Sequence, residues 1–389
     1  MHHSLAPRLR ADVAVRPFDA AEGDCRFVVA VDDRHFIVTA AVAAVLEESR
    51  EPGTFASLAQ RASTRLGVHV SPEQVGQLLR EQAPAILFHA AQSQAVRGPV
   101  WFQRRIASGA TLEPVLKWGA RLFSTRIAVA LAIAFVLVDL FVVSRAVGTT
   151  SRALSAADIG AAFALTAAGI VVHELGHLAA CSRYGARHGG IGLGLYWCFP
   201  TFYAEVHGAW MLPRLQRAAV DVGGVYFQCA YVFALGLFYL ATDAAAVLSA
   251  IAWSHLLMLH TLNPVLKFDG YWLLADLTGS PNLHRRIRSI ARHAWDTLAR
   301  RQVRDLLRHP EMALLIGFVT IALAYFAYVL IMLGHNIAVA AAGAFHPLSI
   351  PQALANATLL ALCIAMAGGV SLLLARSLTL FAREKSDDR

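Results

Sequence analysis

Long apolar stretches decide what this chain can fold into. Beyond Arg126 the sequence holds six stretches that could cross a bilayer, at residues 127–143, 159–180, 222–241, 244–262, 312–333 and 353–380. Inside lipid every backbone polar group must bond within the protein, so such segments form helices or closed barrels. Apolar residues make up 57% of the 389 residues and charged ones only 15%, too apolar for an ordinary soluble enzyme. We expect a mostly helical, polytopic membrane protein with about six transmembrane helices.

The cations at the ends of these stretches predict their orientation. They gather before the first span, after the second and at the end of the sixth, namely Arg104, Arg105, Lys117, Arg121, Arg126, Arg183, Arg187, Arg376, Arg383 and Lys385. Lys and Arg mark the cytoplasmic side, so both termini are predicted in the cytoplasm, with the protein in a bacterial inner membrane. Residues 1–16 contain no apolar core typical of a secretory signal, and we expect none.

The composition disfavours both a nucleic-acid partner and a site or framework built from cysteines. The net charge of +8 lies beside apolar spans, where anionic lipid and topology explain it better than nucleic acid. The five cysteines are scattered and lack a CxxC spacing, which argues against a disulfide framework or a thiolate zinc site. The lipid bilayer and a peptide or membrane-protein substrate are the expected partners.

Residues 1–98 read as a soluble cytoplasmic domain ahead of a membrane-embedded domain at 99–389. Strands at 27–31 and 35–38 predict a hairpin, and helices are predicted at 40–48, 55–66 and 71–82. Ser71 and Gln74 form a capping-box pattern at the start of the third helix. A hairpin with three short helices indicates a winged-helix-like α+β unit that binds a peptide, or one that only packs. Nucleic acid is disfavoured because no helix is dense in Lys and Arg.

An amphipathic segment follows the fourth span. Residues 285–308 hold eight arginines, with apolar residues at helical spacing. This pattern predicts a helix lying along the inner leaflet.

The second span contains the sequence HELGH at residues 173–177. On a helix His173 and His177 lie one turn apart, so both imidazoles can bind one divalent metal, with Glu174 beside it for proton transfer. A charged side chain at membrane depth costs roughly 2.5 to 3.5 kcal/mol on insertion scales, which argues that these residues have a function.

A catalytic zinc site of this type needs a third protein ligand. Asp269 is the best candidate, because Pro264 interrupts the fourth span and Gly270 permits a turn, so a broken helix can present the carboxylate. The other candidates by residue type are Glu205, His207, His255 and His260, each more typical of a pore-lining or hydrogen-bonded residue. Among them His260, one turn before Asn263, is the best substitute.

HELGH in one span, followed by Asn-Pro and Asp-Gly in a later one, resembles the site-2 protease family of intramembrane zinc metalloproteases. Residues 199–203, 210–214 and 263–272 are similar to its peptide zinc metalloprotease branch. The resemblance implies Zn²⁺ ligands at His173, His177 and Asp269, a catalytic Glu174, and Asn263 near the substrate. Members of that branch often carry a PqqD-like peptide-recognition domain at the amino terminus, which residues 1–98 resemble weakly. The PDZ insertion of some bacterial members is missing.

The implied chemistry is hydrolysis of a peptide bond near the cytoplasmic face. Asn263 would donate a hydrogen bond either to the oxyanion or to the substrate backbone. Residues 190–196 alternate glycine with apolar residues, which predicts a membrane-associated β-hairpin whose glycine face pairs with an extended substrate or only packs. Asp139 in the first span and Asp221 at the start of the third are unexplained charges, and we expect each to pair with an arginine near a span end or to face the aqueous path to zinc.

Two uses of such an enzyme stay open: cleavage of a membrane-anchored signalling protein, or maturation of a ribosomally made peptide recruited by residues 1–98. The alternative is a catalytically idle scaffold or a peptide-export component. The intact set of His173, Glu174, His177 and Asp269 argues against it.

Overall fold

The computed structural model describes residues 4–19, 25–32, 34–88, 100–147, 154–196, 199–265, 267–280, 282–299 and parts of 312–331. The chain divides into two compact units, which we describe separately. One unit holds Met1–Leu262 and Leu266–Leu283, and the other holds Asn263–Val265 and His284–Arg389.

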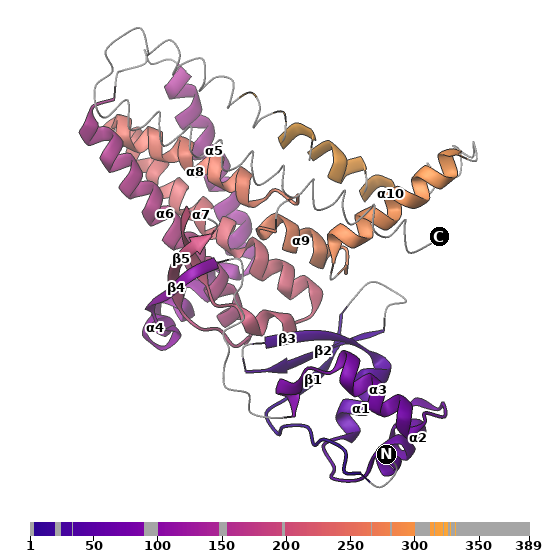
Figure 1. Cartoon of the computed structure of the whole chain (residues 1–389). Helices are drawn as coiled ribbons and strands as arrows, with labels where there is room; N and C mark the ends of the chain where they lie inside the picture. The colour runs from indigo at the N-terminus through magenta and orange to yellow at the C-terminus, as the bar shows by residue number, and fades with distance from the viewer. Residues whose placement is uncertain are drawn as a thin grey trace. The chain divides into compact units, whose positions relative to one another are not determined.

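The amino-terminal part begins with a small antiparallel sheet (Figure 1). Its strands are β1 (Ala14–Phe18), β2 (Arg26–Val31) and β3 (Arg34–Thr39), in the order β1-β2-β3. Helices α1 (Ala40–Glu48), α2 (Phe55–Leu66) and α3 (Pro72–Gln82) and the short η1 (Ala85–Leu87) follow. The predicted hairpin and three helices are confirmed, and β1 is an addition that the sequence reading lacked.

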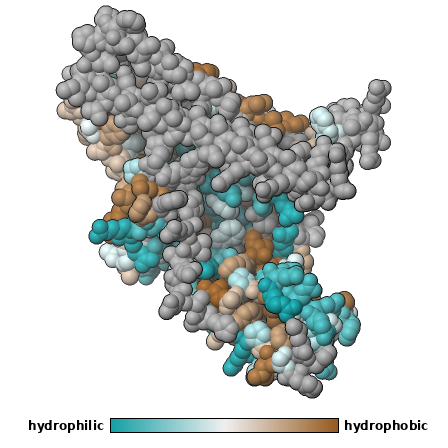
Figure 2. Space-filling model, viewed as in Figure 1, coloured by the Kyte–Doolittle hydropathy of each residue, from teal (hydrophilic) through white to brown (hydrophobic). Residues whose placement is uncertain are grey.

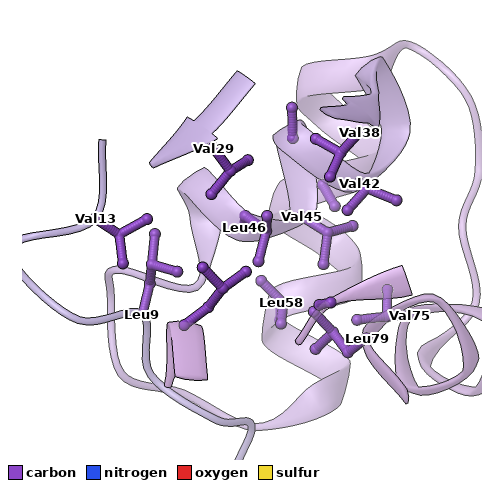
Figure 3. Close-up of a cluster of buried hydrophobic side chains, with 14 of the residues drawn as sticks. Leu9, Val13, Val29, Val38, Val42, Val45, Leu46, Leu58, Val75 and Leu79 are labelled. Carbon is purple, nitrogen blue, oxygen red and sulfur yellow. The ribbon is translucent and has the colours of Figure 1, made fainter. Parts of the chain in front are cut away.

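These elements share one hydrophobic core (Figure 3). Leu46 on α1 and Leu58 on α2 are fully buried, and Val29 from β2 packs with them. The capping box is present, since the Ser71 hydroxyl accepts from the Gln74 N–H and the Gln74 side chain accepts from the Ser71 N–H. Figure 2 shows hydrophilic residues gathered over the outer side of α2 and α3. The predicted boundary at residue 98 lies outside the described residues.

In the part of the chain that the structure describes, three helices are long and apolar enough to cross a membrane: α5 (Thr125–Val147), α6 (Ala156–Arg183) and α7 (Arg214–Thr242). A shorter apolar helix, α8 (Ala245–Thr261), packs with α6 and α7 (Figure 1). Helix α5 exposes large side chains such as Leu140 and Phe141, as a lipid-facing helix does.

The predicted spans are therefore recovered in part. The first three coincide with α5, α6 and α7, and the fourth with α8, which has 17 residues. The fifth falls on a shorter apolar helix, Met312–Tyr325, and the sixth lies outside the described residues. Six transmembrane helices are not established, but a mostly helical chain with small sheets is. The predicted amphipathic helix is α10 (Leu283–Ala299), with residues 300–308 outside the description.

A second sheet, of order β4-β5-β6, combines β4 (Val100–Ala107), β5 (Ile191–Tyr196) and β6 (Phe199–Ala204). The predicted hairpin, β5 and β6, is thus part of a three-stranded sheet. Strand β4 adds the third strand from far earlier in the chain, since the paired residues Ala107 and Ile191 are 84 positions apart. Strand β4 leads into α4 (Gly109–Gly119) and η2 (Ala120–Phe123).

The glycine face of this hairpin is not free for a substrate, which corrects one expectation. Strand β5 pairs with β4 on one edge and with β6 on the other. A Cβ at Gly190 would lie 1.9 Å from the Ala107 oxygen, and one at Gly192 would lie 2.2 Å from the Tyr203 ring. The glycines therefore admit the neighbouring strands. In the described residues, the open edges of the sheet belong to β4 and β6.

The break after α8 occurs as predicted, with a different role for Gly270. Helix α8 ends at Thr261, and α9 (Asp269–Leu277) begins with Asp269 itself. Gly270 is a helical residue of α9 whose Cβ would lie 1.9 Å from the Leu262 oxygen, so glycine permits a close approach rather than a turn.

Candidate metal centre

Helices α6 and α7 approach each other closely beside the HELGH sequence. A Cβ at Gly176 would lie 2.2 Å from the backbone oxygen of Gly223, closer than any real Cβ contact. Small residues of this kind let membrane helices pack backbone against backbone. The approach brings the imidazoles of α6 against α7.

Three predicted ligands converge at this point. His173 Nε2 lies 2.8 Å from Asp269 Oδ2, His177 Nε2 lies 3.1 Å from His173 Nε2, and His177 Nε2 lies 3.4 Å from Asp269 Oδ2. Among the described residues this is a group of metal-ligating type whose ligand atoms all lie within 4.8 Å of one another. Both histidines are buried. Asp269 reaches them from the first turn of α9.

Hydrogen bonds to acceptors on α7 orient the two histidine rings. His177 Nδ1 donates to the backbone oxygen of Val220 at 2.7 Å, and His173 Nδ1 donates to Gln228 Oε1 at 3.1 Å. With each Nδ1 as the donor, each Nε2 keeps its lone pair and points to the common centre. Partners of this kind fix the tautomer and ring orientation of metal-binding histidines.

Gly224 keeps this centre open. A Cβ at this position would lie 2.4 Å from His173 Nε2 and 2.5 Å from His177 Nε2. Glycine is required here because of the space it leaves in front of both ligand nitrogens.

The donor set and its spacing fit zinc. Two neutral imidazoles and a carboxylate are zinc ligands with bonds of about 2.0 to 2.2 Å, which place tetrahedral ligand atoms about 3.3 Å apart. The measured separations of 2.8, 3.1 and 3.4 Å lie around that value. His173, His177 and Asp269 could hold such an ion and leave its fourth position free.

Glu174 lies on the next position of α6 and meets the second sheet. Its carboxylate faces the backbone of Ala204, at the end of β6. Strand β6 packs against α6, so the sheet lies beside Glu174, the predicted general base.

Asn263 belongs to the other compact unit. It is buried, and its Oδ1 accepts from the Val265 N–H at 2.9 Å. Its Nδ2 has no hydrogen-bond partner in the described part of the chain. A buried unpaired donor is costly and so indicates a group that a ligand would satisfy.

A protein of Bacillus subtilis (strain 168) named "Putative peptide zinc metalloprotease protein YydH" is 30% identical to this chain over 107 residues. The matched residues are 27% of this chain and 42% of that protein, so the match spans less than half of the relative. No family model matches the chain, and no solved structure matches it. At a coarse level, the chain is similar to a zinc metalloprotease.

The substitute ligands have other contacts. Glu205 binds Arg105 at 2.7 Å, the rings of His207 and His35 are stacked, and His255 Nε2 lies 3.2 Å from Asp139. The Asp139 charge thus has a histidine partner, whereas an arginine or a water path was expected. The His260 ring packs 4.9 Å from that of Phe268, outside the converging group.

Sequence reasoning missed the groups that α7 contributes. Gln228 is a buried polar residue in an apolar helix, and such residues usually have a functional partner. Gly223 and Gly224 form an adjacent pair in a span, a pattern typical of close helix packing. Both signals were readable, but only the fold shows that they meet HELGH.

Proposed function

We propose that the protein is an intramembrane zinc metalloendopeptidase that cuts a peptide bond near the cytoplasmic face of the membrane. The observation that carries the proposal is the convergence of Asp269 with His173 and His177, which lie beside Glu174 on a helix of membrane-spanning length. The name of the Bacillus relative supports a zinc metalloprotease, and the HELGH and Asp-Gly motifs support the site-2 type.

A zinc ion bound by the three ligands would polarise the scissile carbonyl and acidify the attacking water. Glu174 would take the proton from that water and deliver it to the leaving amine. The packing of β6 against α6 keeps this carboxylate at the end of β6. The unpaired Nδ2 of Asn263 would donate either to the oxyanion or to the substrate backbone.

An extended substrate needs an open strand edge. Strand β6 offers one, and its Ala204 backbone already faces Glu174, so a peptide added along β6 would pass beside the general base. A transmembrane substrate would have to unwind there, because its helical peptide groups are bonded internally.

The substrate is proposed to be a ribosomally made peptide or a membrane protein. The separate core of residues 4–88 supports recruitment of a peptide by the amino-terminal domain. The rival function is that of an idle scaffold or export component. The oriented imidazoles and the unpaired Asn263 donor favour catalysis, because an idle chain has no use for them.

The test uses purified full-length protein in detergent with a transmembrane peptide substrate. Glu174→Gln should keep stoichiometric zinc and lose cleavage, because the base is removed while the ligands stay. Glu113→Gln is the matched control, a half-buried carboxylate on α4 paired with Lys117. Cleavage by Glu174→Gln at the control rate would refute the mechanism, and wild-type protein without zinc would refute the metal site.

A further inference from the structure

Among the described residues, the amino-terminal domain contacts the membrane helices within the same compact unit. The contact lies on η3 (His207–Met211) and the first turn of α7. Phe18 lies beside Trp210, with ring centroids 6.3 Å apart, and His35 lies beside His207 and Trp210. Asp19 accepts a hydrogen bond from the Arg214 N–H at 2.9 Å.

Arg217 is at the centre of this contact. It is an arginine only 3% exposed, and its guanidinium binds three separate segments. Nη2 donates to the backbone oxygen of Asp19 at 3.1 Å, and Nη1 donates to the backbone oxygen of Leu212 at 2.9 Å. Nε donates to Asp276 Oδ1 at 2.7 Å. The Phe18 ring covers the guanidinium, with 4.3 Å from Cζ to the ring centroid. A buried guanidinium is costly unless its donors are satisfied, so the amino-terminal domain completes its environment.

The ion pair between Arg217 and Asp276 connects this contact to the helix that carries Asp269, a residue of the metal centre. Asp276 and Asp269 are both on α9 and seven residues apart, about two helical turns, so they lie on the same face of the helix. Trp272 of α9 also packs edge-on against Trp210, with centroids 5.6 Å apart. The contact that receives Phe18 and Asp19 therefore holds the helix that presents the third ligand.

Helix α7 provides a second connection. Asp19 supplies a carboxylate to the first N–H of α7, where a helix has unsatisfied donors and a positive dipole end. The same helix carries Val220, Gly224 and Gln228, which orient and border the imidazoles. Both α7 and α9 are thus held from the amino-terminal domain.

We propose that Arg217 is a positioning residue through which docking of the amino-terminal domain sets the affinity of the metal centre. With Phe18 and Asp19 in place, the guanidinium is fixed, Asp276 is held, and α9 keeps Asp269 beside His173 and His177. When the domain leaves, Arg217 loses the Phe18 ring that covers it and its hydrogen bond to Asp19, and α9 loses its anchor. Coupling is reciprocal, so metal binding also tightens docking. The inference deepens the proposed function, since it gives the amino-terminal domain a regulatory role at the same site.

The test measures zinc affinity of the full-length protein in detergent by competition with a chelator, without any substrate. Phe18→Ala and Asp19→Ala should each weaken zinc binding by about 5-fold or more, the lower end of typical coupling between sites. Asp19→Asn keeps an oxygen acceptor and should bind like the wild type. Asp12→Ala is the matched control, an exposed carboxylate of the same domain that pairs with Arg10.

Two further measurements separate positioning from loss of fold. The Tm of the metal-free protein should be the same for Asp19→Ala and Asp12→Ala. In an Asp276→Ala background the effect of Phe18→Ala should shrink, because the side-chain acceptor that links Arg217 to α9 is already removed. Zinc affinities of Phe18→Ala and Asp19→Ala equal to that of Asp12→Ala would overturn the coupling alone. Wild-type protein that binds no zinc would instead overturn the proposed function, and the coupling with it.

Discussion

His173 and Asp269 are 96 residues apart in the chain, and their side chains meet at 2.8 Å. The contact joins the middle of a membrane-length helix to the first residue of α9. Asp269→Ala should lower zinc affinity by more than about 100-fold, because removing a ligand costs more than removing one of its hydrogen-bond partners. Metal analysis of purified protein measures this.

Asp243→Ala provides the control for that substitution, since it removes an exposed aspartate at the end of α7 that pairs with Arg145. It should leave zinc content unchanged. Stoichiometric, tightly bound zinc in Asp269→Ala would exclude Asp269 as a ligand and direct attention to His260.

Gly224→Ala should block the metal centre. The added methyl group would lie 2.4 Å from His173 Nε2, in the space that an ion and its ligands need. Zinc binding and cleavage should both be lost. Gly160→Ala is the same change in α6 with nothing within 4 Å, and it should be neutral or stabilise by up to about 1 kcal/mol. Normal zinc binding by Gly224→Ala would show that the site opens elsewhere.

Asn263→Ala should impair cleavage while zinc content stays normal. If Asn263 serves the oxyanion, kcat should fall by about 10²–10³ with little change in KM. If it binds the substrate backbone in the ground state as well, KM should rise instead. Steady-state kinetics on one peptide distinguishes the two. Unchanged values of both constants would remove Asn263 from the site.

Deletion of residues 1–98 should reduce turnover of the native substrate more than that of an unrelated model helix. The comparison is made at saturating zinc, so that a weakened metal centre affects both substrates alike. Recruitment by the amino-terminal domain predicts the larger loss for the native substrate. Equal losses would assign the domain a packing or positioning role without recognition.

Local patterns were sufficient for much of this fold. The bounds of α1 and α2, and the Ser71 cap of α3, follow from helical spacing and capping chemistry that act within a few residues. The pairing of His173 with His177 follows from helical geometry. Asp269 was reached through a motif and a proline, because the break in the helix is itself local.

Other features depend on contacts that no local pattern encodes. Strands β1 and β4 are defined by pairing, and β4 finds its partner far along the chain. Arg217 reads as one more cation at the start of a span, yet it is buried under Phe18 and bound to Asp276. From sequence alone, the glycines of β5 predict a face that is free for a substrate. In the structure, β4 and the Tyr203 side chain occupy that space.

The pairing of β4 with β5 has a consequence for biogenesis. Between Ala107 and Ile191 the chain passes through α4, α5 and α6 before the ladder can close. During synthesis, β4 therefore cannot pair with β5 until α5 and α6 have been made and the chain beyond them has emerged. The ladder can close only at that point, so a ribosome stalled before residue 191 would leave Glu174 without the sheet that receives it.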